Sequence, residues 1–213
     1  MWTEPEPDNA ALDRLRGRLA VAAAADGVLD LAFTVLSTPV GDLLLAASER
    51  GLVRVAYAVE DHDRVLQTLA DRLSPRILRA PARLDAAVRQ LEEYFTGSRR
   101  SFDLPLDLAL SGGFRSEVQR HLSTIDYGTT RTYAEVATRV GNRRAVRAVG
   151  SACATNPLPV VVPCHRVLRT DGGLGGYIGG LPAKTALLEL ERARSRAPAE
   201  PASTRSTRQT PSR

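Results

Sequence analysis

Two side chains that could perform nucleophilic chemistry stand next to each other late in this 213-residue chain. Cys164 and His165 lie in the segment Pro163-Cys164-His165-Arg166-Val167, directly after an apolar run. A thiol attacks as its thiolate, and a neighbouring imidazole that accepts the proton is a common way to form one. The apolar run predicts that the nucleophile lies at the floor of a pocket. The pair alone fits equally well a small buried cysteine that fills core space.

The residues around this pair resemble those of a known family. Asn156-Pro157-Leu158-Pro159 precedes the pair, and Gly179-Gly180-Leu181 and a closing helix that ends at Glu191 follow it. This pattern is similar to that of the O6-alkylguanine-DNA alkyltransferases, the methylated-DNA–protein-cysteine methyltransferases. The resemblance is dense from Gly112 to Glu191 and looser from Leu31 to Leu110. Further residues at the spacing of the family are Tyr133, Arg147, Asn156, Tyr177 and Glu191.

The resemblance implies an enzyme that repairs DNA in a single turnover. Cys164 would take the alkyl group of O6-alkylguanine irreversibly, with O4-alkylthymine as a second candidate substrate. His165 would act as the base through a bound water, and Glu191 would orient its imidazole. Asn156 would fix the turn between the recognition helix and the active-site strand, because an Asn side chain can bond to local backbone. The alkyl donor is the DNA itself, so no cofactor is expected.

The resemblance also assigns residues to the flipped nucleotide, because a lesion inside the duplex stack must be extruded before it reacts. Arg147 would fill the vacated space in the stack. Tyr133 would lie against the phosphate and donate a proton toward guanine N3. Tyr177 and Pro159 would form opposite walls of the base pocket. Ile178 stands where the family commonly has Ser, which brings leaving-group assistance and adduct preference into question.

Composition places the chain among ordinary soluble globular proteins, with 43% hydrophobic and 25% charged residues. No run approaches the roughly 20 apolar residues of a membrane span. The acidic start lacks the features of a signal peptide, so we expect a cytoplasmic protein. The two cysteines, Cys153 and Cys164, have no CxxC partners, and a reducing compartment argues against a disulfide. We therefore expect no metal site. The overall interpretation is a monomer with no obligate protein partner.

Positive charge is concentrated around the motif. Residues 112–169 carry nine arginines and three acidic residues, whereas residues 1–111 have an acidic excess. A local basic field of this kind suits a phosphate-binding surface, and with the resemblance it predicts double-stranded DNA bearing alkylated guanine as the partner. Solvated arginine-rich helices remain the alternative.

The chain is predicted to have an α+β fold with four parts. Residues 1–30 form an extension with a helix over Leu12–Ala24. Residues 31–108 form a scaffold domain with a small antiparallel sheet and two helices. Residues 109–191 form a mostly helical domain for DNA binding and alkyl transfer, and residues 192–213 a disordered tail. The expected strands, separated by short turns, are Leu31–Ser37, Asp42–Ala47 and Leu52–Ala58.

A helix-turn-helix precedes the motif. Thr132 and Glu135 form a capping-box pattern at the start of its first helix. Gly141 ends that helix, and Asn142 is expected to cap a second helix over about Arg143–Ala154. The outward face of this second helix is small and suits a close approach in the minor groove. The predicted inward residues are Ala145, Ala148, Val149 and Ala152, and the outward ones Arg143, Arg147, Gly150, Ser151 and Ala154.

Three other functions compete with alkyl transfer. An alkyltransferase-like protein would bind the lesion without repairing it, but such relatives replace the nucleophile that this chain keeps as Cys164. A thiol hydrolase or acyltransferase would use Cys164, His165 and Glu191, although no oxyanion motif is evident. A helix-turn-helix repressor would leave the Cys-His motif unexplained, and a small-residue helix is poorly suited to reading bases.

Overall fold

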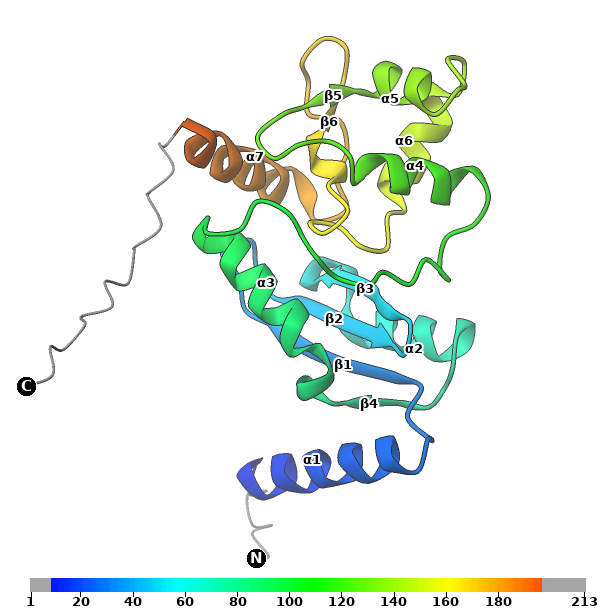
Figure 1. The fold of residues 1–213 in the computed structure, drawn as a ribbon, viewed down its shortest axis with the longest axis vertical. Helices are drawn as coiled ribbons and strands as arrows, with labels where there is room; N and C mark the ends of the chain where they lie inside the picture. Colours follow the sequence, from blue (N-terminus) through cyan, green and yellow to red (C-terminus); the bar gives the residue numbers. More distant parts are fainter. Residues whose placement is uncertain (1–8, 197–213) are drawn as a thin grey trace, which may run out of the picture.

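The chain forms an N-terminal sheet domain and a C-terminal helical domain that pack against each other (Figure 1). The computed structural model describes residues 9–196. The N-terminal domain contains α1 (Asn9–Ala25), β1 (Leu31–Leu36), β2 (Leu43–Ser48), β3 (Gly51–Tyr57), α2 (His62–Arg72), β4 (Ile77–Arg79) and α3 (Asp85–Thr96). The C-terminal domain contains α4 (Phe114–Leu122), β5 (Arg131–Thr132), α5 (Tyr133–Arg139), α6 (Val146–Ala154), β6 (Val167–Leu168) and α7 (Gly180–Arg196). The predicted α+β class is confirmed.

The N-terminal sheet has the strand order β3-β2-β1-β4. The antiparallel pairing of β1 with β2 and of β2 with β3 confirms the meander expected from the short turns. The sheet is nevertheless mixed, because β4 pairs with β1 in parallel. This three-residue strand was not predicted, since its pattern is too short to stand out. It returns after α2, a crossover helix long enough to allow parallel pairing.

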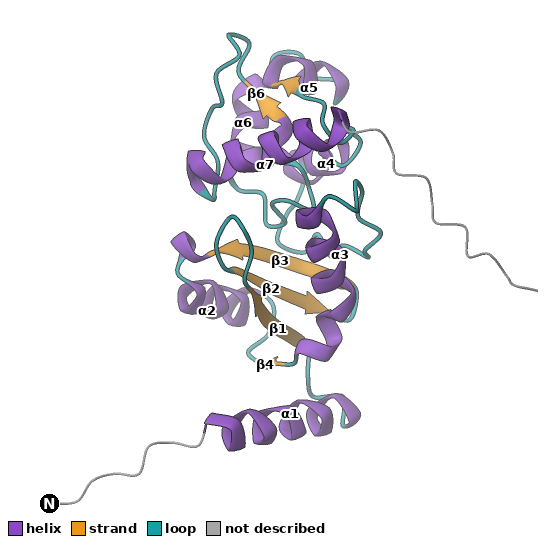
Figure 2. Cartoon of the chain, turned by 90° about the vertical axis from the view of Figure 1, so that its left-hand side faces the viewer, coloured by secondary structure: helices purple, strands orange, loops and turns teal. Residues whose placement is uncertain are grey.

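The sheet is covered on both faces, with α2 and α3 on opposite sides (Figure 2). Successive side chains of β2 point to opposite faces, as strand geometry requires. Leu43 and Leu45 join the core cluster that contains residues of α3, whereas Leu44 and Ala46 pack with Leu69 of α2. Burial on both faces explains the almost continuous apolar sequence of this strand.

The connection between the domains runs along the edge of β3. Leu52 donates its backbone N–H to the carbonyl of Pro105 at 2.9 Å, and its own carbonyl accepts from Asp107 at 2.9 Å. Gly51 has a φ of 136°, and a Cβ there would lie 2.1 Å from the Pro105 oxygen. Only glycine fits this position, so Gly51 is what allows the linker to approach the edge of β3 so closely.

The largest core cluster is continuous across both domains. It contains Leu91 and Tyr94 of α3 together with Leu122 of α4 and Leu187 of α7. Tyr94 is fully buried. The C-terminal helices therefore rest on α3 and the sheet, and the N-terminal domain can position groups of the C-terminal domain.

The predicted capping box at α5 is present. The Thr132 side chain accepts from the backbone N–H of Glu135, and the Glu135 carboxylate accepts from the Thr132 N–H. The second helix of the pair differs from its prediction, because α6 begins at Val146 and Asn142 does not cap it. The Asn142 carbonyl instead accepts from the Ala145 N–H in a turn at 2.9 Å.

The predicted faces of α6 hold in part. Val149 and Ala152 are buried as expected, whereas Ala145 is half-buried and Ala148 is exposed. The outward side chains of Arg143, Arg147, Ser151 and Ala154 are exposed, and Gly150 is half-buried.

The terminal helices extend beyond their predicted limits. α1 spans Asn9–Ala25, and α7 continues from Gly180 to Arg196, past the boundary predicted at residue 191. Residues 1–8 and the tail from 197 to 213 lie outside the described part of the chain. Among residues 9–196, no helix combines the length and apolar character needed to span a bilayer.

Candidate active site

Cys164 lies at the start of a short 3-10 helix, η3 (Cys164–Arg166), which follows a series of turns after α6. The expected active-site strand is absent between Pro157 and Pro163. Prolines lack the N–H that a strand ladder needs. Val160 adds a φ of 72°, which is rare for a β-branched residue. The nucleophile is therefore held by a compact turn rather than by a sheet.

Asn156 holds this turn by three hydrogen bonds. Its side-chain amide donates to the Val162 carbonyl at 2.8 Å and to the Cys164 Sγ at 3.2 Å. Its side-chain oxygen accepts from the backbone N–H of Leu158 at 3.0 Å. Asn156 is completely buried. One side chain thus links the end of α6, the turn and the sulfur atom.

The Cys164 thiol is buried, with 2% of the residue exposed. Burial raises its pKa to about 11, against the opposing effects of the Asn156 hydrogen bond and the positive charge of Lys184. The thiol is therefore protonated at neutral pH in the resting protein. A nucleophilic reaction of Cys164 needs a base nearby.

His165 is paired with Glu191 and has one ring nitrogen left over. His165 Nε2 lies 2.9 Å from Glu191 Oε1, and both side chains are buried. A carboxylate fixes the tautomer in which Nε2 carries the proton, so Nδ1 is the acceptor. Within the described residues, Nδ1 is buried without a hydrogen-bond partner. Burial lowers the pKa of His165, which keeps the imidazole neutral and able to accept a proton.

Glu191 of α7 is the centre of a buried network. Besides His165, its carboxylate accepts from the Tyr94 hydroxyl at 2.7 Å, the Gly128 N–H at 3.0 Å and the Arg166 guanidinium at 2.8 Å. Burial opposes ionisation, but the hydrogen bonds from His165 and Arg166 lower the pKa of Glu191 below its usual value. The carboxylate is therefore charged and fixed in orientation.

Sequence reasoning missed Tyr94 and Arg166. Arg166 stands inside the quoted motif. What marks it as part of the site is its burial, which the sequence does not reveal. Its guanidinium also donates to the Ile125 carbonyl at 2.6 Å. Tyr94 comes from α3 of the N-terminal domain, 97 positions before Glu191, and nothing in its local sequence marks it.

Tyr177 of the C-terminal domain contacts Tyr57, a tyrosine of the N-terminal domain. The hydroxyls of Tyr57 and Tyr177 are 2.9 Å apart, and their rings meet edge to face. A Cβ on Gly179 would lie 2.7 Å from the Tyr57 ring, so glycine is required for this approach. The Tyr177 ring also lies edge to face with the His165 ring, with centroids 6.4 Å apart. Tyr177 therefore lies beside the reactive pair.

The glycine-rich loop packs against Tyr133. A Cβ on Gly175, which has a φ of 66°, would lie 2.8 Å from the Tyr133 hydroxyl. Burial raises the pKa of Tyr133 to about 12, so its hydroxyl keeps its proton. Lys184, the only lysine of the chain, holds the loop from behind by donating to the carbonyls of Leu174 and of Val167. Sequence reasoning did not assign Lys184, although its uniqueness was visible.

The predicted site residues thus fall into a buried group and an exposed group. Cys164, Asn156, His165 and Glu191 are buried at one centre. Tyr177 and Ile178 are partly buried, and Pro159 is buried in the turn. The exposed group is the outward face of α6 and the turn before it: Arg143, Arg147, Ser151 and Ala154, with half-buried Gly150.

The buried group provides a thiol, a neutral imidazole and an orienting carboxylate, the components of a cysteine nucleophile with its base. The exposed group provides positive charge on a helix-turn-helix. In residues 9–196, no cluster of three His, Cys, Asp or Glu side chains could bind a metal ion.

This combination of fold and site defines a cysteine-dependent transferase with a helix-turn-helix. Residues 31–108 match the model of the ribonuclease-like domain of 6-O-methylguanine DNA methyltransferase, and residues 113–193 match that of its DNA binding domain. The chain belongs to the 6-O-methylguanine DNA methyltransferase family.

Individual relatives agree with this assignment. The methylated-DNA–protein-cysteine methyltransferase of Methanosarcina barkeri is 41% identical over 160 residues, which cover 75% of this chain and 96% of the relative. The crystal structure of the Mycobacterium tuberculosis O6-methylguanine methyltransferase has a TM-score of 0.70 at 37% identity, covering 80% of this chain and 96% of that one. The structure of Mycobacterium tuberculosis OGT in complex with DNA has a TM-score of 0.67 at 38% identity, covering 79% of this chain and 96% of that one.

Proposed function

We propose that this chain repairs DNA by moving the alkyl group of O6-alkylguanine irreversibly to Cys164. The observation that carries the proposal is the buried thiol, bonded to Asn156 and followed directly by the His165–Glu191 pair. It occurs in a chain of the 6-O-methylguanine DNA methyltransferase family. The fold and the relatives both favour an enzyme over a lesion-binding protein.

The chemistry is an in-line displacement at the alkyl carbon. His165 Nδ1 draws the thiol proton away through a water, and Glu191 stabilises the imidazolium that forms. The S–C bond at Cys164 forms as the bond from carbon to guanine O6 breaks, and the electron pair leaves with guanine. Tyr133, which keeps its proton at neutral pH, is placed to donate it toward guanine N3.

The DNA is bound as a duplex through the exposed face of α6. The exposed side chains of Ser151 and Ala154 and half-buried Gly150 allow a close approach to the minor groove, and Arg143 adds positive charge. Arg147, exposed in the first turn of α6, fills the stack when the nucleotide is flipped. Tyr133 lies against the phosphate of that nucleotide.

The flipped base enters between Tyr177 and Pro159. Because only 2% of Cys164 is exposed, residues that cover it must move before the base can reach the sulfur. At Ile178 the family's common hydroxyl is missing, and the backbone N–H replaces it as the donor toward O6. Activity on methyl adducts survives this change, whereas preference among bulkier adducts depends on it.

The thioether formed at Cys164 is inert, so each molecule acts once. The reaction takes its alkyl group from DNA and needs no cofactor. A monomer without an obligate protein partner, working in the cytoplasm, remains our prediction. O4-alkylthymine remains a candidate second substrate.

The test is to incubate the protein with duplex DNA that contains one O6-methylguanine and to map the mass change by digestion. We expect a gain of about 14 Da, one CH₂, on the peptide that contains Cys164 and no gain in Cys164→Ser. Cys153, the other buried cysteine, is the internal control and should stay unmodified. Tight lesion binding without an adduct would indicate a lesion-binding protein instead. Neither binding nor adduct would favour a thiol hydrolase.

A further inference from the structure

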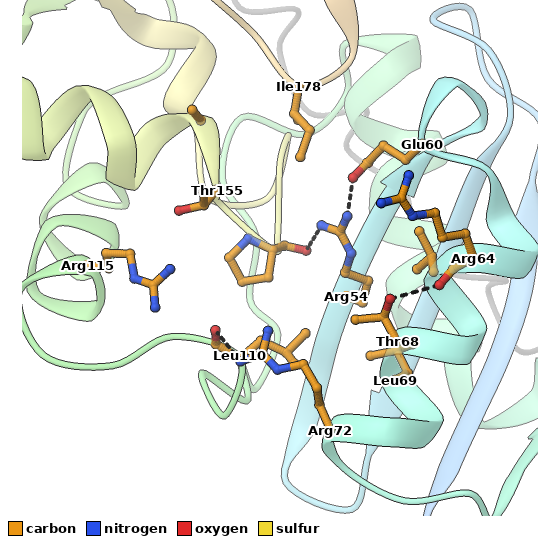
Figure 3. A pocket seen from close by; sticks show the side chains of 13 residues that line it. Arg54, Glu60, Arg64, Thr68, Leu69, Arg72, Leu110, Arg115, Thr155 and Ile178 are labelled. Carbon is orange, nitrogen blue, oxygen red and sulfur yellow. Dashed lines mark hydrogen bonds and ion pairs between the residues drawn. The ribbon is translucent and has the colours of Figure 1, made fainter.

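A cavity of about 490 Å³ lies between the two domains, beside the proposed base pocket (Figure 3). Its walls come from α2 and β3 of the N-terminal domain and from the start of α4, the end of α6 and Ile178 of the C-terminal domain. The charged residues that line it are Arg54, Glu60, Arg64, Arg72 and Arg115. Four guanidinium groups and one carboxylate leave this cavity strongly positive.

The arginines of this cavity, the arginine pocket, differ in their partners. Arg54 is held in place by Glu60 and by the Pro157 carbonyl. Arg64 and Arg115 are exposed. Within the described part of the chain, no carboxylate lies within salt-bridge distance of either one. Arg72 is likewise without a carboxylate there and donates only to the Leu110 carbonyl, at 3.4 Å. Three positive charges therefore face the cavity without neutralisation.

The other polar groups of the pocket do not compete for a ligand. The hydroxyl of Thr68 donates to the Arg64 carbonyl at 2.9 Å, and that of Thr155 donates to the Ser151 carbonyl at 2.9 Å. The donors available to a ligand are therefore the guanidinium groups. Planar guanidinium groups match the geometry of phosphate oxygens, which they can bind in pairs.

The position of the pocket indicates where its phosphate comes from. Ala154, on the outward face of α6, lines the pocket, and so does Ile178 of the base pocket. The pocket therefore continues from the surface on which the proposed function places the DNA. Arg115 of α4 lies on the side of the pocket formed by the C-terminal domain, and Arg64 and Arg72 of α2 lie on the side formed by the N-terminal domain (Figure 3).

We propose that the arginine pocket binds a backbone phosphate of the same DNA duplex whose lesion is repaired. The N-terminal domain then contributes a DNA contact of its own, through α2. This inference rests on the proposed function, because it takes the substrate to be duplex DNA. The contact reads no sequence and anchors the strand next to the flipped nucleotide.

The test compares the salt dependence of DNA binding in two double variants of equal charge. Arg64→Gln/Arg115→Gln removes two of the free charges of the pocket. Arg76→Gln/Arg89→Gln removes two exposed charges that are paired elsewhere, with Asp30 and Glu93. The probe is a duplex with one O6-methylguanine, and the observable is the slope of log K against log salt concentration.

We expect the pocket variant to reduce the steepness of the slope by about 0.9, the value for one phosphate contact, and to bind roughly tenfold more weakly at 0.1 M salt. The control variant should keep the wild-type slope. Transfer from free O6-benzylguanine, a base without phosphate, and the melting temperature report whether each variant has an intact active site and fold.

Two results would overturn the inference while leaving alkyl transfer standing. One is a pocket variant with the wild-type slope. The other is a slope that drops equally in both variants, since net charge alone would then explain it. Inorganic phosphate that raises the melting temperature of the wild type but not of the pocket variant, without a change in slope, would assign the pocket to a free anion. A wild-type protein that forms no adduct at Cys164 would refute the proposed function instead.

Discussion

The two domains differ in how often their arginines are paired with carboxylates. In the N-terminal domain, arginines are mostly paired within the fold, as Arg76 is with Asp30 at 2.8 Å and Arg99 with Glu93 at 2.7 Å. In the C-terminal domain, a long series of arginines has no carboxylate within salt-bridge distance among residues 9–196. These are Arg115, Arg120, Arg131, Arg139, Arg143, Arg144 and Arg147. Uncompensated charge of one sign repels itself and is tolerated where a polyanion neutralises it.

Each domain also contains exceptions to this difference. Arg64 and Arg72 belong to the N-terminal domain but are free of carboxylates and face the arginine pocket. Arg166 belongs to the C-terminal domain but is buried against Glu191. Membership of a domain alone therefore does not determine whether an arginine is paired.

Breaking the buried ion pair between Arg166 and Glu191 should have the largest effect. In Glu191→Gln, the Arg166 guanidinium stays buried without a counter-charge, and we expect a loss of about 3–5 kcal/mol in the free energy of unfolding. Alkyl transfer should also be lost, because His165 loses its orienting carboxylate. Urea denaturation measures the first effect, and adduct formation measures the second.

The exposed pair Arg169–Asp171 is the matched control, with both side chains 63% exposed. Asp171→Asn should cost less than about 1 kcal/mol, because water screens this pair. Equal losses in the two variants would mean that burial of the pair at Glu191 has no special consequence.

The same carboxylate should make stability depend on acid. The pKa of Glu191 is lowered in the folded state by His165 and Arg166, in spite of its burial. Its stabilisation is therefore complete above the unfolded pKa of about 4.3 and is lost as the pH falls toward the folded value. Wild-type unfolding free energy should fall between pH 5 and pH 3 by more than that of Glu191→Gln. Parallel curves for the two proteins would contradict this assignment.

Removing the hydroxyl of Tyr94 tests how the N-terminal domain supports the site. Tyr94→Phe deletes a buried hydrogen bond of 2.7 Å to a charged acceptor, and we expect a loss of about 1.5–3 kcal/mol. Tyr127→Phe is the matched control, because the Tyr127 hydroxyl is buried without a partner in the described residues. That change should be neutral or stabilising. Thermal denaturation of both variants decides, and equal destabilisation would show that the bond to Glu191 contributes nothing.

The sequence could predict those features of the fold and site that depend on residues close together in the chain. The Thr132–Glu135 capping box and the β1–β3 meander were predicted correctly, because each depends on residues close in the chain. The contact from Tyr94 to Glu191 joins positions 97 residues apart, and only the packing of α3 against α7 creates it. No local pattern distinguishes that tyrosine from any other core aromatic residue.

The errors have the same origin. A helix was expected from Arg143, because Asn142 is a residue type that often caps a helix. The structure forms a turn there and begins α6 at Val146, because Asn142 bonds to Ala145 instead of capping. The family resemblance implied an active-site strand after Asn156, but the prolines of this segment cannot complete a strand ladder. At Asn142, the competing local hydrogen bond was not visible from residue type.

Arg147→Ala tests the unpaired side of the comparison. Arg147 is exposed on α6 and has no carboxylate partner within the described residues, so its loss should leave the stability of the fold within about 0.5 kcal/mol. The affinity for a duplex with O6-methylguanine should fall by about 1–3 kcal/mol, or roughly 5- to 150-fold. Arg89→Ala, which removes a charge paired with Glu93 on α3, should change this affinity less than about twofold. Similar losses in both variants would remove the distinction between paired and unpaired arginines.

The smallest effect is expected for Arg50→Gln, which tests the paired side. Arg50 is 73% exposed, and its partner Asp107 keeps hydrogen bonds from the Ser48 hydroxyl at 2.6 Å and the Ala109 N–H at 3.0 Å. The stability loss should stay below about 1 kcal/mol, and the salt slope of DNA binding should not change. Arg131→Gln removes the same charge from the C-terminal domain, where no carboxylate of the described chain pairs with it, and should lower the slope. If both changes lower it alike, the DNA responds to total charge, and pairing within the fold does not mark where it binds.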